Sequence, residues 1–359
     1  MAIRSGTDIH KLICIYCGRT FDGANSEGDH IIPARLGEFR NSPKFKNICQ
    51  FCNNKIGKSE EQLLRCGPER LYRDLVVPET NRSRGKKSSW AVGSSGAPPP
   101  KILIKTPNGE LMGRPGPDPL SPEIIDQIVI EDNSGGEFPI PLFPKMTTKN
   151  LKKQISELIK TQNIKGNISI RWNCNEEYED HYKKLIKELY PNAEMKPLPP
   201  LEPGRYSVPG RMEFKVSDHY FRALAKISFH YYLATSQRVT GQESGFSSIR
   251  SFICNGGKYE DFFEKKKRIV LPIPQGMAPS RWCHVLAVHE SNKGVTGYIA
   301  LFLGPTGRKI ENHIRLGQLD SHLLLPDFVW SHVFTYDENP TSIGKVGDAF
   351  PAALTKIWP

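Results

Sequence analysis

The sequence predicts an α+β protein in which a small zinc-stabilised module precedes a larger α+β region. Three observations support this prediction. Two Cys-x-x-Cys pairs lie within Cys14–Lys58, a stretch rich in Gly, Ser, Pro and basic residues follows at Arg82–Lys101, and strand-like and helix-like patterns are mixed in the remainder. The 359 residues suffice for two or three domains of roughly 100–200 residues each.

The four cysteines of the first stretch have the spacing of zinc ligands. Each pair, Cys14/Cys17 and Cys49/Cys52, places two thiolates on one tight turn, where both can bind the same tetrahedral ion. The 31 residues between Cys17 and Cys49 exceed the roughly 15–20 of a simple zinc ribbon, so another segment is inserted there. We predict a structural four-thiolate zinc site, with a buried thiol cluster or disulfides as the alternative.

The inserted segment begins with Asp29-His30-Ile31-Ile32-Pro33, which predicts a short strand that ends at the proline. Ala34–Lys46 has no clear period and predicts a loop. Asn53, directly after the last of these cysteines, opens a helix predicted to run to about Leu71. A unit this small needs an added constraint such as zinc to be stable.

Asp29 and His30 offer the chemistry that phosphodiester hydrolysis requires. A neutral His30, with an ordinary pKa of about 6.5, can take a proton from water near neutral pH. Asp29, on the opposite face of the strand, can bind Mg²⁺ together with Asn53, which leaves the ion net positive and open to waters and a phosphate oxygen. The dipeptide recurs at Asp180-His181 and Asp218-His219 in predicted helices, so only its place between the cysteine pairs distinguishes Asp29-His30.

The order Cys-x-x-Cys, Asp-His-Ile-Ile-Pro, Cys-x-x-Cys-Asn-x-Lys resembles the HNH endonuclease superfamily, which has a ββα-metal fold with a structural zinc. The resemblance covers about Leu12–Leu71. It implies a nuclease in which His30 is the general base and Asp29 and Asn53 hold a catalytic divalent ion, Mg²⁺ or another. It also implies that the four cysteines bind the zinc. Two departures stand out: Lys44 lies where many relatives have Asn, and Asn53 replaces the final histidine.

The net charge of +11 favours a polyanionic partner, most simply nucleic acid. Residues 1–90 contain 16 Lys and Arg against 10 Asp and Glu, and the resulting net charge of +6 is more than half of the +11 of the whole chain. Arg35, Lys55 and Lys58 are candidate phosphate contacts, although a solvated helix face or simple solubility explains such charge equally well. No run approaches the roughly 18 apolar residues of a membrane span, and Met1–Lys11 lacks an export signal, so we predict a cytoplasmic protein without membrane contact.

The predicted organisation has five parts. They are a nuclease module at 1–80, a basic Gly/Ser/Pro-rich linker at 81–101, an α+β subdomain at 102–196, a proline-rich connection at 197–209, and a C-terminal α+β domain for targeting or regulation at 210–359. Helices are expected at Asn150–Thr161, Glu176–Leu189 and Ser217–Gln237. The last is apolar around much of its circumference and is therefore predicted to be buried. Its histidines, like those after it, do not fall at metal-ligand spacings.

The sequence thus favours a metal-dependent HNH endonuclease, with DNA as the preferred substrate by resemblance and defence or restriction as a setting. The alternative is a non-catalytic zinc protein that binds nucleic acid or regulates. We also expect residues 1–90 to fold, bind zinc and cut weakly alone, and the second half to fold alone. The sequence does not define a protein partner or an oligomeric state.

Overall fold

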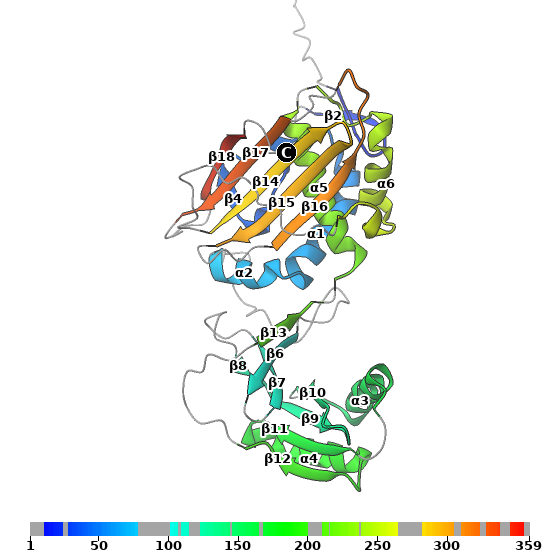
Figure 1. Cartoon of the computed structure of the whole chain (residues 1–359), viewed down its shortest axis with the longest axis vertical. Helices are drawn as coiled ribbons and strands as arrows, with labels where there is room; N and C mark the ends of the chain where they lie inside the picture. The colour runs from blue at the N-terminus through cyan, green and yellow to red at the C-terminus, as the bar shows by residue number, and fades with distance from the viewer. Residues whose placement is uncertain are drawn as a thin grey trace, which may run out of the picture. The chain divides into compact units, whose positions relative to one another are not determined.

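The computed structural model describes residues 11–23, 28–77, 101–106, 109–114, 123–143, 146–164, 168–199, 210–214, 216–236, 238–264, 282–304, 310–323, 328–337 and 345–354. The chain forms two compact units (Figure 1). Unit 1 contains Met1–Ser88, Gly93–Pro98 and Lys215–Pro359, and unit 2 contains Ser89–Val92 and Pro99–Phe214. The predicted basic linker lies outside the described residues except for its last residue, as does most of the proline-rich connection. No helix within the described ranges is long and apolar enough to span a bilayer.

Unit 1 is built on a six-stranded sheet with the order β16-β15-β14-β17-β18-β4. The strands are β14 (Cys283–Ser291), β15 (Gly294–Leu303), β16 (Ile310–Gly317), β17 (Phe328–Tyr336), β18 (Lys345–Leu354) and β4 (Glu38–Arg40). Neighbours are antiparallel except β18 and β4, which are parallel. The turn between β14 and β15 ends at Gly294, whose φ of +114° suits only glycine. The edge strand β4 comes from the N-terminal part of the chain.

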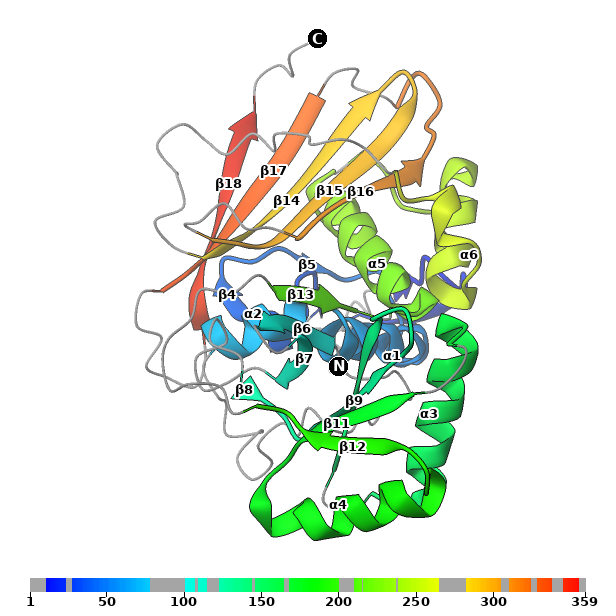
Figure 2. The ribbon, with the colours of Figure 1, turned by 60° about the horizontal axis from the view of Figure 1, so that its bottom comes forward.

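Helix α5 (Asp218–Thr235) is the central helix of this unit and lies between the sheet and α1 (Gln50–Cys66), as Figure 2 shows. Its side chains from Ala223 to Tyr232 are buried, which confirms the prediction of a buried helix there. Helix α6 (Ser247–Asn255) packs beside α5, and α2 (Glu69–Val76) follows α1. An apolar helix enclosed on two sides can bury nearly its whole circumference.

The N-terminal module has the predicted zinc-stabilised ββα form. Its strands are β1 (Lys11–Ile13), β2 (Thr20–Asp22), β3 (Asp29–His30) and β5 (Lys44–Phe45), with the short helix η1 (Ala34–Leu36) before β4. Strand β3 pairs with β5, and α1 follows. The predicted loop Ala34–Lys46 therefore contains η1, β4 and β5. The predicted single helix to Leu71 is two helices, because Pro68 lacks the N–H that a continuing helix would use.

This module and the C-terminal domain, which are expected to fold separately, pack together in unit 1. One hydrophobic core joins Ile32, Ile56 and Leu63 of the module to Leu224 and Ile227 of α5. The module also donates β4 to the sheet, where Arg40 lies 2.6 Å from Asp348 and 3.0 Å from Asp337. The hydroxyl of Tyr336 in β17 donates to the Leu36 carbonyl. Neither half can bury its apolar face without the other, which the sequence pattern alone does not reveal.

The described residues of unit 2 form two small sheets and two helices, consistent with the predicted α+β class. Sheet β13-β6-β7-β8 is formed by β6 (Lys101–Thr106), β7 (Gly109–Arg114), β8 (Glu123–Ile124) and β13 (Gly210–Glu213). Sheet β10-β9-β11-β12 is formed by β9 (Gln127–Glu131), β10 (Glu137–Pro141), β11 (Ser169–Asn173) and β12 (Glu194–Pro197). Helices α3 (Thr148–Gln162) and α4 (Glu176–Leu189) share a core with the second sheet and confirm the predicted helices.

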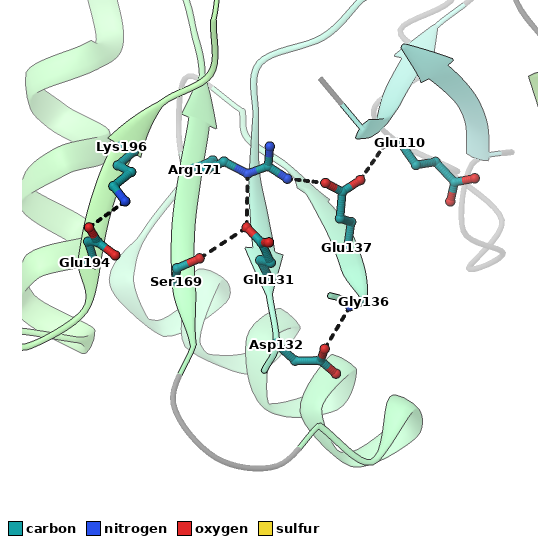
Figure 3. Close-up of polar contacts among 9 residues, drawn as sticks. All are labelled: Glu110, Glu131, Asp132, Gly136, Glu137, Ser169, Arg171, Glu194 and Lys196. Carbon is teal, nitrogen blue, oxygen red and sulfur yellow. Dashed lines mark hydrogen bonds and ion pairs between the residues drawn. The ribbon is translucent and has the colours of Figure 1, made fainter. Parts of the chain in front are cut away.

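Arg171 ties three strands of unit 2 together (Figure 3). Its guanidinium on β11 lies 3.5 Å from Glu131 on β9 and contacts Glu137 on β10. The second oxygen of Glu137 accepts a hydrogen bond of 2.9 Å from the Glu110 backbone N–H on β7. These contacts are satisfied cross-strand pairs, so we assign them to the stability of unit 2.

The shared core predicts that a fragment of residues 1–90 will not fold cooperatively, even with zinc present. The fragment lacks α5 and the sheet that bury the apolar face of α1, and the exposed face favours aggregation or a molten state. Thermal melting followed by circular dichroism, with the full-length chain as control, tests this. A zinc-loaded fragment with a sharp melting transition would show that the module does not depend on the C-terminal region.

Candidate active site

The four predicted zinc ligands converge. The sulfur atoms of Cys14, Cys17, Cys49 and Cys52 all lie within 4.8 Å of one another. The Cys17 and Cys49 sulfurs are 3.7 Å apart, close to the edge of about 3.8 Å expected for a ZnS₄ tetrahedron with Zn–S bonds of about 2.3 Å. The four thiols thus fit one zinc ion, and the grouping predicted from the spacing is confirmed.

Local backbone geometry brings the cysteines together. The first turn closes when the Gly18 N–H donates to the Cys14 carbonyl at 2.9 Å, and Gly18 takes a φ of +69° that favours glycine. Cys49 caps the N-terminus of α1, which places Cys52 in the first turn of the helix. The Ile15 N–H donates to the Asn47 carbonyl at 3.0 Å and joins the two turns.

The protonation of these thiols depends on their surroundings. Burial acts to raise the pKa of Cys14, but backbone N–H groups of Cys49, Cys17 and Tyr16 outweigh it and lower that pKa to about 7. Burial and the neighbouring thiols raise the pKa of Cys52. Four thiolates so close together repel one another, so a bound cation is needed to hold all four deprotonated.

The predicted catalytic residues lie on β3 and at the start of α1. The strand pairing sets Asp29 opposite Phe45 and His30 opposite Lys44. The His30 side chain is half-buried, and so is Asn53 in the first turn of α1. Alternation along the strand directs Asp29 away from the His30 face, toward the interior.

The three predicted phosphate contacts remain at the surface. Arg35 in η1 and Lys55 and Lys58 on α1 are exposed. Lys55 donates a hydrogen bond of 3.1 Å to the side chain of Asn255 at the end of α6. Exposed cations on the module are available for electrostatic contact with a polyanion.

Asp29 is held by a side chain that the sequence reasoning missed. The Lys226 ammonium on α5 lies 2.5 Å from Oδ2 of Asp29 and 2.5 Å from Oε1 of Glu60 on α1. Nδ1 of His230, one turn further along α5, lies 3.3 Å from the same Oδ2. The Lys226 side chain is fully buried, and Asp29 is only 13% exposed. A buried ammonium therefore joins two carboxylates from different elements.

The charges in this cluster follow from its surroundings. Burial acts to raise the pKa of Asp29, but His230 and Lys226 outweigh it and hold that pKa below its usual range. Burial acts to lower the pKa of Lys226, but Glu60 and Asp29 raise it, so the ammonium stays charged. Burial raises the pKa of Glu60 and lowers the pKa of His230 to about 4, so His230 is neutral near pH 7.

A polar stripe on α5 is the sequence signal that could have revealed this cluster. His219, Lys226 and His230 fall at helical spacing on a largely apolar helix. All three face the module: His219 Nδ1 lies 3.0 Å from the Ser59 hydroxyl, and the other two contact Asp29. Polar residues on one face of a buried helix require partners, because unpaired buried polar groups are costly.

The zinc turns, the β3–β5 pair and α1 define a zinc-stabilised ββα module of the nuclease type. Comparison with known families agrees, since residues 14–65 match the family described as HNH endonuclease. This match spans 52 of the 359 residues and confirms the resemblance seen in the sequence. No curated protein and no solved structure matches the chain.

The zinc site predicts that Cys49→Ser will lose zinc and destabilise all of unit 1, because the binding energy of a structural zinc is folding energy. Metal analysis should give one zinc per wild-type chain, and the variant should melt at a clearly lower temperature. Cys174→Ser, a half-buried thiol of unit 2, is the matched control and should keep its zinc. A zinc-free wild type, or an undisturbed Cys49→Ser, would contradict this site.

Proposed function

We propose that the protein is a metal-dependent endonuclease that hydrolyses phosphodiester bonds of nucleic acid, with DNA as the favoured substrate. The observation that carries the proposal is the placement of Asp29-His30 on β3, inside the zinc-stabilised ββα segment that matches the HNH family. Neither the dipeptide nor the zinc site would suffice alone. Defence or restriction is the proposed setting, and the cytoplasm is the proposed location.

His30 is assigned the role of general base. Its side chain is half-buried on β3, so it keeps access to water while the strand pair fixes its backbone. As a neutral imidazole it can accept the proton of the attacking water near neutral pH. The adjacent Asp29 is tied to α5, which limits movement of the whole strand.

Asp29 and Asn53 are assigned to the divalent ion. Lys226 and His230 both approach Oδ2 of Asp29, and Oδ1 is the donor oxygen assigned to the metal. Asn53 and Glu60 are seven residues apart on α1 and lie on one face, about 10 Å apart along the helix. Asn53 thus shares a face of α1 with Glu60, and Glu60 is linked to Asp29 through Lys226. Oxygen donors of this kind suit Mg²⁺, which when bound stabilises charge on the phosphate.

Substrate binding is assigned to exposed cations of the module, with Arg35, Lys55 and Lys58 as phosphate contacts. Contacts of this type give affinity that falls steeply with salt and carries little sequence information. Any sequence preference then has to come from other parts of the chain.

A second candidate is a zinc protein that binds nucleic acid without cutting it. The observation that favours it is the ion pair on Asp29, since a carboxylate already neutralised by a buried lysine can be purely structural. The two candidates differ in whether Mg²⁺ produces cleavage that EDTA abolishes.

His30→Ala is expected to slow cleavage by about 10²–10⁴-fold, the usual contribution of a general base. The melting temperature, zinc content and nucleic-acid affinity should stay near wild type, because the role is in the reaction barrier. Duplex DNA, single-stranded DNA and RNA should each be tested with Mg²⁺ and with EDTA. His181→Ala, which changes the second Asp-His pair on α4, is the matched control. Undiminished cleavage by pure His30→Ala would refute the assignment.

A further inference from the structure

We propose that Lys226 is a positioning residue of the nuclease site, which holds Oδ2 of Asp29 so that the other oxygen can bind the divalent ion. This inference rests on the function proposed above and extends it, because it makes α5 of the C-terminal region part of the active site. The observation that leads to it is that the printed contacts of Lys226 and of His230 fall on the same oxygen, Oδ2 of Asp29.

Asp29 needs such support because β3 is only two residues long and pairs with an equally short β5. A short ladder fixes the backbone weakly, and the carboxylate can still rotate about two bonds. A metal ligand that must first be ordered binds its ion less tightly, because the ordering entropy opposes binding. An external contact that fixes the carboxylate removes this cost in advance.

Lys226 is itself tightly constrained. Its side chain is fully buried, and its ammonium is enclosed by carboxylates at 2.5 Å on either side, Asp29 and Glu60. It cannot reach solvent without breaking both contacts, each of which compensates for burying the charge. Lys226 is thus a fixed donor toward Asp29.

His230 makes a second contact with the same oxygen of Asp29 and links Asp29 to the zinc site. Lys226 and His230 are one helical turn apart, so their side chains lie on the same face of α5 and reach the same oxygen. On the other side of the ring, Nε2 lies 2.8 Å from the Tyr16 hydroxyl. The Phe45 ring packs against the imidazole with the two ring centroids 4.4 Å apart. Tyr16 belongs to the first zinc turn, between Cys14 and Cys17.

These contacts form one chain from the zinc turn to the proposed metal ligand: Tyr16 contacts His230, and His230 contacts Asp29. Lys226 contacts the same oxygen of Asp29. Outer partners of this kind typically change metal affinity by roughly 10–100-fold when they are lost. The same contact could instead act as a latch that keeps the ion away from Asp29. The two roles predict opposite changes in the metal requirement of cleavage.

The test uses the full-length protein and the double variant Lys226→Met/Glu60→Gln, which removes the lysine without leaving Glu60 as an unpaired charge. Two quantities are measured: the Mg²⁺ concentration for half-maximal cleavage, and Mn²⁺ binding followed by electron paramagnetic resonance without substrate. Both should shift to about 10-fold or higher metal concentrations, with cleavage partly restored at saturating Mg²⁺. Lys226→Arg should restore part of the affinity.

Lys153→Met, an exposed lysine on α3 of unit 2, is the control and should change neither quantity. Melting temperature and zinc content identify variants that fail to fold. If the double variant fails to fold, the two metal measurements on Lys226→Arg, which keeps the charge, decide the test. Faster cleavage or a lower Mg²⁺ requirement in the variants would show a latch and overturn the proposal. An unchanged metal requirement with a lower melting temperature would show that Lys226 only stabilises the fold.

The outcomes also separate this inference from the nuclease function. Metal-dependent cleavage by the wild type that Lys226 variants do not affect would overturn the positioning role and leave the function intact. Mn²⁺ binding that Asp29→Asn abolishes, without any cleavage, would refute the function while the Lys226 variants still test positioning. A wild type that neither cuts nor binds Mn²⁺ would refute both.

Discussion

The buried contact between the Lys226 ammonium and the carboxylates of Asp29 and Glu60 connects the two parts of unit 1. Three ionisable groups out of water are tolerated only when each has an oppositely charged neighbour. Removing one partner of such a pair typically costs about 3–5 kcal/mol, because the other is left buried and uncompensated. The nuclease module and helix α5 therefore depend on each other through charge as well as through their shared apolar core.

The cysteine cluster and the shared core hold different parts of unit 1 in place. A zinc ion bound by the four cysteines would fix the two cysteine turns, and with them the entry into α1 and the place of Tyr16. The core and the sheet then hold the module against α5, with β4 as the sixth strand. In this arrangement α5 faces Asp29 with Lys226 and His230. This explains how the small N-terminal module can be tied to a large C-terminal region.

The sequence predicted what depends on local spacing. The cysteine pairs predicted a converging thiol cluster and the apolar run around Leu224 predicted a buried helix, and both are confirmed. The short strand predicted from Asp29 to Pro33 is shorter than expected and covers only Asp29–His30. The roles of Asp29, His30 and Asn53 are proposals that rest on their place in the ββα module.

What the sequence did not predict depends on contacts between distant segments. Lys226 and Asp29 are far apart in the chain, and helical periodicity tells which residues share a face without telling what that face meets. Likewise β4, a three-residue stretch without a strand pattern, forms because β18 offers it a parallel edge. Such pairings follow from tertiary packing, which overrides weak local propensity.

The most direct measurement is a crystal structure of the full-length protein grown with Mn²⁺, with anomalous scattering recorded for zinc and manganese. We predict zinc at the four cysteines and manganese in contact with Asp29 and Asn53, with Lys226 still on Oδ2 of Asp29. Manganese bound elsewhere, or a cysteine cluster without zinc, would contradict this account of the site.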